Sequence, residues 1–95
     1  MSDIVNGAVQ ALSEKITGGF EGAVKFAIEG EGSIMVDGSG VHAGDEDADV
    51  TLSADADTFQ AILSGEMNPT SAFMTGKLSV DGDMGIAMKL GSLLA

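Results

Sequence analysis

The apolar residues of this chain change their period several times, and each change marks the border of a secondary-structure element. Over residues 4–16 they fall on one side of a helical wheel, whereas over residues 24–28 they alternate with other residues. A period near 3.6 is typical of an amphipathic helix, and a period of two is typical of a strand with one buried face. We therefore expect a first helix, capped by Ser2 or Asp3 and ended by the Gly pair at 18–19, and then a strand.

Three more strands follow the first at close spacing. Turn signals stand at residues 30–32 and 37–38, and the acidic run at 45–47 predicts a loop. In the strand after that loop, Val50 and Leu52 share one face opposite polar residues. Four consecutive strands at this spacing predict an antiparallel meander. The expected strands cover residues 24–28, 34–36, 41–43 and 50–52.

The second half of the chain returns to a helical period, with one strand inserted. Asp55 suits the positive end of a helix dipole, and Gly65 ends that helix. Asn68 followed by Pro69 predicts the start of a second, short helix that ends near Gly76. The expected helices cover residues 55–65, 68–76 and 83–93, and the fifth strand covers residues 77–81.

The element order α-β-β-β-β-α-α-β-α predicts an α+β fold, in which a five-stranded, mostly antiparallel sheet carries helices on one face. The length of 95 residues and a hydrophobic content of 44% suit one domain over residues 1–95. No apolar run approaches the roughly 18 residues of a membrane span, and the N-terminus lacks the features of a secretory signal. With no Cys in the sequence, we expect a cytoplasmic protein.

The last helix carries more apolar surface than one packed face needs. Its apolar arc spans roughly 220°, whereas a helix on a core needs about 100°. A domain of 95 residues has no large core to absorb the excess, so the helix packs either on a partner subunit or over an apolar cavity that a ligand fills. The arc consists of Met84, Ile86, Ala87, Met88, Leu90, Leu93 and Leu94.

Methionine is concentrated in the same half of the chain, at Met67, Met74, Met84 and Met88. Because Met has three flexible torsions and a polarisable sulfur, these side chains suit a pocket that accepts cargo of several shapes. The alternative is that they only fill gaps between helices and sheet.

The charge of the chain excludes several partners. Fifteen Asp and Glu stand against four Lys and no Arg, which gives a net charge of −11. Such a surface repels phosphate backbones, so nucleic acid is excluded as a partner and membrane contact is at most transient. Molar salt screens this self-repulsion, and the composition therefore predicts a salt-loving, halophilic source.

No arrangement of residues points to catalysis, a cofactor or a metal. The single His, His42, stands between apolar residues on a short strand and is interpreted as a surface or structural residue. Asp45, Asp47 and Asp49 imitate the opening of a calcium loop, but Val50 stands where that loop needs Gly, so we expect at most weak, hydrated cation binding there. The sequence therefore predicts a protein that is not an enzyme.

The second half of the chain also resembles a known family. The segments that carry the resemblance are residues 48–52, 57–59, 62–65, 67–69, 72–74, 76–78, 82–85 and 87–90. They closely resemble the sterol carrier protein type-2 (SCP-2) lipid-transfer domain. The resemblance implies a hydrophobic tunnel between sheet and helices that takes up sterols, fatty acids, fatty acyl-CoA, isoprenoid-like and other lipids without altering them covalently.

The resemblance also implies which side chains line that tunnel, and the apolar pattern of strand and Met residues adds three more. The residues matched to the family are Phe59, Ile62, Leu63, Phe73, Met74, Met84, Met88 and Leu90, and we add Phe26, Met67 and Leu94. The first hypothesis is thus a monomeric lipid carrier. The alternatives are an interaction module whose last helix packs on a twin or partner chain, and a domain that presents lipid to a separate enzyme.

Overall fold

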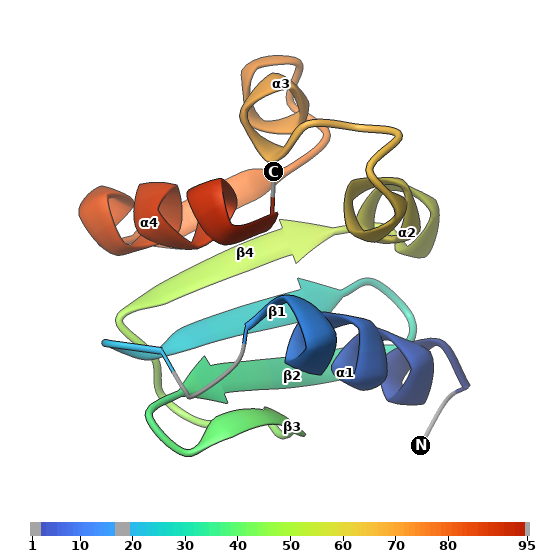
Figure 1. Ribbon diagram of the computed structural model, residues 1–95. Coiled ribbons are helices and arrows are strands. Elements are labelled where there is room, and N and C mark those ends of the chain that lie inside the picture. The colour runs from blue at the N-terminus through green and yellow to red at the C-terminus, as the bar shows by residue number, and fades with distance from the viewer. Residues whose placement is uncertain (1–2, 17–19, 95) are drawn as a thin grey trace.

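The structure, a computed structural model, describes residues 3–16 and 20–94 (Figure 1). Within these residues it has four helices and five strands in the predicted order. The expected cap Ser2 and the expected helix end at residues 18–19 lie outside the described residues. The elements are α1 (Asp3–Lys15), β1 (Val24–Ile28), β2 (Gly32–Asp37), β3 (Gly40–Ala43), β4 (Val50–Ala54), α2 (Ala56–Ser64), α3 (Pro69–Met74), β5 (Ser79–Gly82) and α4 (Met84–Leu94).

The five strands form one sheet in the order β3-β2-β1-β4-β5. All neighbours are antiparallel except β1 and β4, which run parallel with Val24 opposite Val50. The predicted meander of the first four strands is therefore wrong at β4, because residues 44–49 carry the chain past β2 and β1. An interior place between β1 and β5 suits β4, since Val50, Leu52 and Ala54 are all buried.

The helices cover one face of this sheet, as predicted. The helix α1 packs on β2 and β3, the helix α4 packs on β4 and β5, and α2 contacts α1 (Figure 1). Between them lies one apolar core, in which each fully buried large side chain contributes about 1.5–3 kcal/mol through removal from water. Its largest fully buried members are Phe59, Leu12, Ile34, Leu90, Val5, Val24, Val36 and Val50. Among the described residues, no helix is both long enough and apolar enough to span a membrane.

The helix ends follow the capping signals of the sequence. Asp55 caps α2, with its Oδ1 accepting the Thr58 N–H at 2.7 Å. This hydrogen bond lowers the pKa of Asp55, so the cap stabilises the fold at neutral pH and loses that effect as acid protonates the carboxylate. Gly65 ends α2 in the left-handed conformation with a φ of 86°. Asn68 caps α3 by accepting the Thr70 N–H at 2.8 Å.

The fifth strand begins two residues later in the chain than the predicted residues 77–81 and ends one residue later. Leu78 is excluded from the ladder because its N–H donates to the Ala72 carbonyl of α3 at 3.1 Å. Pairing instead begins at Ser79 and continues to Gly82, which lies opposite Val50. Leu78 remains buried, as the predicted apolar face requires, although the strand itself begins two residues later.

Gly82 is a position where only glycine fits. Its φ is 126°, and a Cβ there would collide with the Asp49 carbonyl and lie 2.8 Å from the Cα of Val50. The Asp49 carbonyl directly precedes β4 and Val50 is its first residue, so neither backbone atom can move without opening the sheet. We expect Gly82→Ala to lower the free energy of unfolding by about 3 kcal/mol, the sum of backbone strain and overpacking. Urea denaturation followed by circular dichroism measures this difference.

Gly7 is the matched control for that substitution. It lies exposed within α1, and a Cβ there would meet nothing within 4 Å. Gly7→Ala is expected to raise the free energy of unfolding by about 0.5–1 kcal/mol, because Ala loses less backbone entropy in a helix. Equal effects of the two substitutions would contradict the close approach of β5 to β4.

Candidate functional site

A cavity of about 420 Å³ opens between α3, α4 and the β4–β5 side of the sheet. Its floor is built from buried side chains, among them Phe26, Leu52 and Leu78. Its walls come from the two helices, with Phe73 on α3 and Met88 on α4. The complete lining is Phe26, Leu52, Ile62, Asn68, Pro69, Thr70, Phe73, Met74, Leu78, Val80, Met84, Ala87, Met88, Gly91 and Ser92.

Local sequence signals fix where the two helices beside this space begin. Pro69 stands in the first turn of α3, where its fixed φ suits a helix start. The start of α4 is capped by Asp83, whose Oδ1 accepts the Ile86 N–H at 3.1 Å. Because Gly82 pairs closely with β4, the chain turns sharply into α4, which returns across the sheet beside α3.

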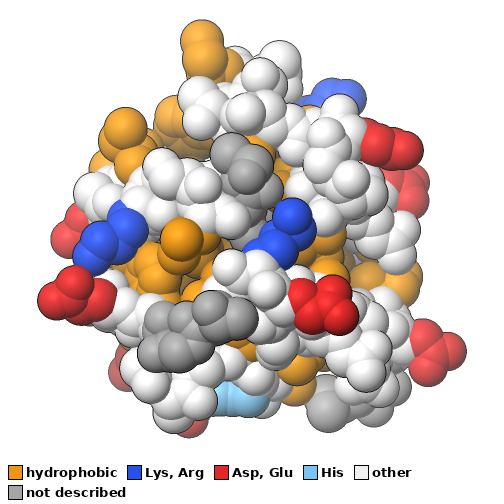
Figure 2. Space-filling view, viewed as in Figure 1, with side chains coloured by type: hydrophobic (Ala, Val, Ile, Leu, Met, Phe, Trp, Pro, Cys, Tyr) orange, Lys and Arg blue, Asp and Glu red, His pale blue; other side chains and the backbone are white. Residues whose placement is uncertain are grey.

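The rim of the cavity is apolar and exposed. The exposed fractions are 78% for Met74 and 69% for Met88, and Phe73 and Met84 are also exposed. In Figure 2, apolar side chains protrude at the upper edge of the molecule, where Figure 1 places α3 and α4. Flexible thioether side chains at an opening can adjust to guests of different shape.

The cavity offers apolar contact and a few hydrogen-bonding groups, but no charge. None of the described residues that line it is Asp, Glu, Lys, Arg or His. The polar side chains in the lining are Asn68, Thr70 and Ser92. Asn68 already accepts the Thr70 N–H as the helix cap. The site can therefore hold an apolar body, whereas nothing in its lining acts as a general acid, a base or a metal ligand.

Six of the eleven residues expected at the site lie in the cavity lining: Phe26, Ile62, Phe73, Met74, Met84 and Met88. Phe59 and Leu90 belong to the core instead, with exposed fractions of 1% and 0%. Leu63 and Met67 are half-buried and pack against the core outside the lining. The side chain of Leu94 lies outside the described residues. The structure shows a cavity at this place, and the tunnel stays a prediction.

Among the lining residues that the sequence interpretation missed are Leu52 and Val80 on the strands and Ala87 on the last helix. Leu52 and Val80 face each other across β4 and β5 and lie in the cavity lining. The alternation of Leu52 and Val80 with polar residues predicts that both side chains face the protein interior. It does not indicate that they face a cavity rather than packed side chains. Ala87 was placed in the apolar arc of the last helix, and that arc is the signal that could have found it.

A second hollow of about 710 Å³ is more polar. Glu29, Asp55 and Lys77 are among the residues that line it.

The acidic residues that imitate the opening of a calcium loop form contacts within the protein. Asp45 forms an ion pair with Lys25 at 2.9 Å, and Asp49 accepts the Ala23 N–H at 3.0 Å. Neither the second hollow nor this acidic run suits an apolar guest or a calcium shell.

Comparison with known proteins connects the chain to carriers of lipid. The family model described as the SCP-2 sterol transfer family matches residues 6–95. Hydroxysteroid dehydrogenase-like protein 2 of Xenopus laevis is 37% identical over 93 residues, which cover 90% of this chain and 22% of that protein. Sterol carrier protein 2 of Rattus norvegicus is 48% identical over 65 residues, covering 67% of this chain and 11% of that protein. The chain thus spans about a fifth or less of these relatives.

A solved structure shares the fold. The solution structure of sterol carrier protein 2 from Aedes aegypti, in complex with the C16 fatty acid palmitate, has a TM-score of 0.78 and 21% sequence identity. The likeness covers 100% of this chain and 97% of that chain. The two proteins therefore have the same arrangement of helices and strands.

Proposed function

Since the chain belongs to the SCP-2 sterol transfer family, we propose that it binds the apolar body of a lipid in the cavity between α3, α4 and the sheet, and carries it without chemical change. The cavity of about 420 Å³ with an uncharged lining is the observation that carries this proposal. The palmitate complex of a protein with the same fold supports a fatty acyl chain as one cargo. Sterols, fatty acyl-CoA and isoprenoid-like lipids are further proposed cargoes.

The energy of chain burial is large enough for useful affinity. Removing about 16 chain carbons from water contributes about 13 kcal/mol at about 0.8 kcal/mol each. Association and chain ordering cost at least about 4 kcal/mol. The remainder is therefore at most about 9 kcal/mol, which corresponds to a dissociation constant of about 0.3 μM or higher. Because apolar burial is not directional, chain length and width decide the affinity more than the headgroup does.

A charged headgroup finds no partner in the cavity, so we infer that it stays in water at the rim. None of the described lining residues carries a charge, and burying an unpaired carboxylate or phosphate costs several kcal/mol. The net charge of −11 adds repulsion for anionic headgroups. We therefore propose that cargo enters with its apolar end first.

Displacement of a fluorescent fatty acid tests the proposed function. The protein, shown to be monomeric by light scattering, is loaded with the probe in molar KCl and titrated with palmitate. We expect saturable displacement at about one equivalent. Absence of saturable binding in the monomer would contradict the proposal.

A second candidate function follows from the exposed rim. Phe73, Met74, Met84, Met88 and Leu93 are all large apolar residues exposed to solvent, and such patches also mark protein interfaces. This favours the alternative in which α4 packs on a twin or on a partner chain. Presentation of lipid to a separate enzyme is a further alternative, and co-purification with that enzyme would support it. A dimer that binds no fatty acid would support the interaction module over the carrier.

The acidic surface supports a further part of the proposal, that the protein works at high salt. We expect the melting temperature to rise by about 4–8 °C between low salt and molar KCl, which corresponds to about 1 kcal/mol for a domain of this size. The double variant Asp47→Asn with Glu66→Gln removes two exposed carboxylates and should reduce this rise. An unchanged melting temperature across the salt range would rule out the halophilic interpretation.

A further inference from the structure

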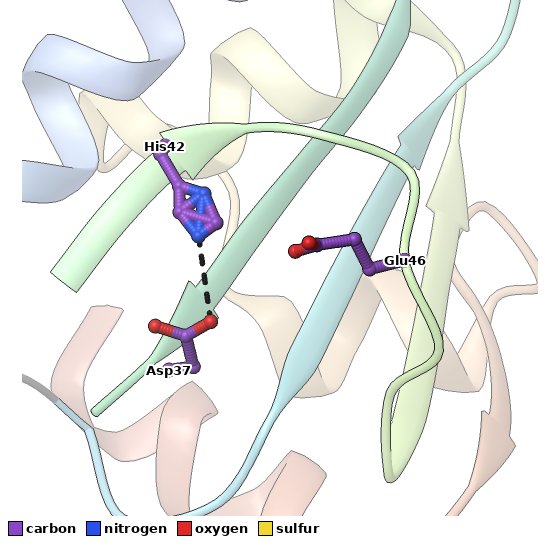
Figure 3. A group of neighbouring side chains, drawn as sticks. All are labelled: Asp37, His42 and Glu46. Carbon is purple, nitrogen blue, oxygen red and sulfur yellow. Dashed lines mark hydrogen bonds and ion pairs between the residues drawn. The ribbon is translucent and has the colours of Figure 1, made fainter. Parts of the chain in front are cut away.

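The face of the sheet opposite the helices carries a cluster that the lipid site does not use. Asp37, His42 and Glu46 each offer a ligand atom, and these atoms lie within 4.8 Å of one another (Figure 3). Asp37 and His42 belong to the β2–β3 hairpin, whereas Glu46 comes from the crossover of residues 44–49. In Figure 3 the Glu46 carboxylate points toward the space beside the other two side chains. The cluster thus brings side chains of the hairpin and of the crossover close together.

The two hairpin residues, Asp37 and His42, already lie at the distance expected for two ligands of one metal ion. His42 Nε2 and Asp37 Oδ2 are 3.4 Å apart. A tetrahedral ion with bonds of about 2.0–2.2 Å holds its ligands about 3.3–3.6 Å apart. As a direct hydrogen bond, by contrast, 3.4 Å is long and weak. An ion bound between these atoms therefore displaces little that stabilises the hairpin.

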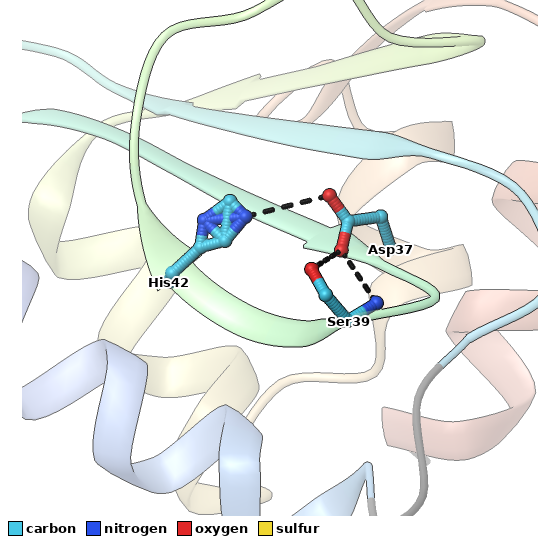
Figure 4. Close-up of polar contacts among 3 residues, drawn as sticks. All are labelled: Asp37, Ser39 and His42. Carbon is cyan, nitrogen blue, oxygen red and sulfur yellow. Dashed lines mark hydrogen bonds and ion pairs between the residues drawn. The ribbon is translucent and has the colours of Figure 1, made fainter.

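The carboxylate of Asp37 is oriented for this role. Its Oδ1 accepts the Ser39 N–H at 2.9 Å and the Ser39 hydroxyl at 2.6 Å (Figure 4). The Oδ2 atom therefore remains directed at His42. Hydrogen bonds of this kind fix the orientation of metal ligands.

The crossover is held close enough to supply the third ligand. The Gly44 N–H donates to the Ser33 carbonyl at 3.1 Å, and a Cβ on Gly44 would lie 3.2 Å from Met35 Cγ and 3.8 Å from Glu46 Oε1. Met35, with an exposed fraction of 1%, is thus covered by the start of the crossover. Glu46 itself is exposed, so its side chain can move the further distance of about 1 Å that a tetrahedral ion requires.

The donor set determines the class of ion. One imidazole nitrogen and two carboxylate oxygens suit Zn²⁺ and similar divalent transition metals, whereas Mg²⁺ and Ca²⁺ prefer oxygen ligands alone. The net charge of −11 attracts cations of any kind to the surface, and the nearby ammonium of Lys25 is neutralised by Asp45. We propose that Asp37, His42 and Glu46 bind one divalent transition-metal ion, which joins the β2–β3 hairpin to the crossover, with water completing the coordination.

The single His of the chain makes this proposal directly measurable. In a ¹H–¹³C NMR titration with ZnCl₂, the ring signals of His42 are expected to shift and to saturate at one equivalent. MgCl₂ at the same concentration should leave them unchanged. His42 signals that stay in place, or that drift without saturation, would overturn the proposal.

Two variants distinguish Zn²⁺ binding at the three proposed ligands from general attraction of Zn²⁺ to the negatively charged surface. Glu46→Gln removes a proposed ligand, and Asp47→Asn removes the neighbouring exposed carboxylate with the same change in charge. We expect the first to weaken Zn²⁺ binding at least about tenfold and the second to change it less than twofold. Equal weakening by both would show that Zn²⁺ responds only to net charge, against the proposal. Lipid binding is measured separately and does not depend on this outcome.

Discussion

Ala87→Phe is expected to weaken the binding of palmitate by about 200-fold. Ala87 is half-buried on α4 and lies in the lining of the 420 Å³ cavity. A benzyl group there occupies space that about four methylenes of the guest would fill, and their loss costs about 3.2 kcal/mol at about 0.8 kcal/mol each. Converted at 1.4 kcal/mol for each tenfold change, this is the expected loss of affinity. Competition against a fluorescent fatty acid measures it.

The matched control is Ala61→Phe. Ala61 is also half-buried on a helix, but it belongs to α2 and is absent from the cavity lining. The Ala61→Phe variant should bind palmitate with an affinity within twofold of that of the parent protein. The Ala87→Phe substitution should also weaken the binding of a shorter fatty acid less than the binding of palmitate. The shorter chain extends less far into the part of the cavity that the new Phe side chain occupies. Equal affinities for palmitate in the two variants would place the guest somewhere other than this cavity.

The second large effect concerns stability. We expect Phe59→Ala to lower the free energy of unfolding by about 3–5 kcal/mol. Phe59 has an exposed fraction of 1%, and its ring lies 5.1 Å from that of Phe26, centroid to centroid. A domain of this size has a total stability of about 5–15 kcal/mol, so this loss leaves it close to unfolding. Urea denaturation of the ligand-free protein is the measurement.

Met88→Ala, unlike Phe59→Ala, should weaken palmitate binding while it leaves the free energy of unfolding nearly unchanged. Met88 has an exposed fraction of 69% at the rim of the cavity, so its truncation should change stability by less than about 0.5 kcal/mol. It should nevertheless weaken palmitate binding, because the side chain contacts the guest in the proposed complex. A large stability loss in Met88→Ala together with none in Phe59→Ala would reverse the assignment of core and rim.

Most of the fold could be predicted because its signals are local. Caps such as Asp55 and Asn68 are bonded as the sequence indicates, and the periods gave the type and order of every element. The position of β4 could not be predicted in this way. Turn residues report which strands are joined, whereas the pairing of β4 with β1 depends on burial of both strands in the centre of the sheet.

The candidate site could be predicted only in outline. The wide apolar arc of the last helix indicated surplus apolar surface, and Met84 and Met88 from that arc lie in the cavity lining. Phe59 and Leu90 have the same apolar pattern but face the core, since periodicity identifies an inward side chain without showing whether packed atoms or space lie beyond it. The cluster at His42 was not expected at all, because it depends on where the crossover places Glu46.

The central claim is that a lipid guest occupies the cavity between α3, α4 and the sheet, and the methionine methyl groups test it most directly. With ¹³C-methyl-labelled Met, palmitate is titrated into the protein while the methyl signals of Met74, Met84 and Met88 report on the cavity. Met35, buried on the opposite face, is an internal reference. We predict saturable shifts and contacts to the palmitate chain at the cavity methyls, with Met35 unchanged. Shifts confined to Met35, or no saturable change at the cavity methyls, would contradict the account.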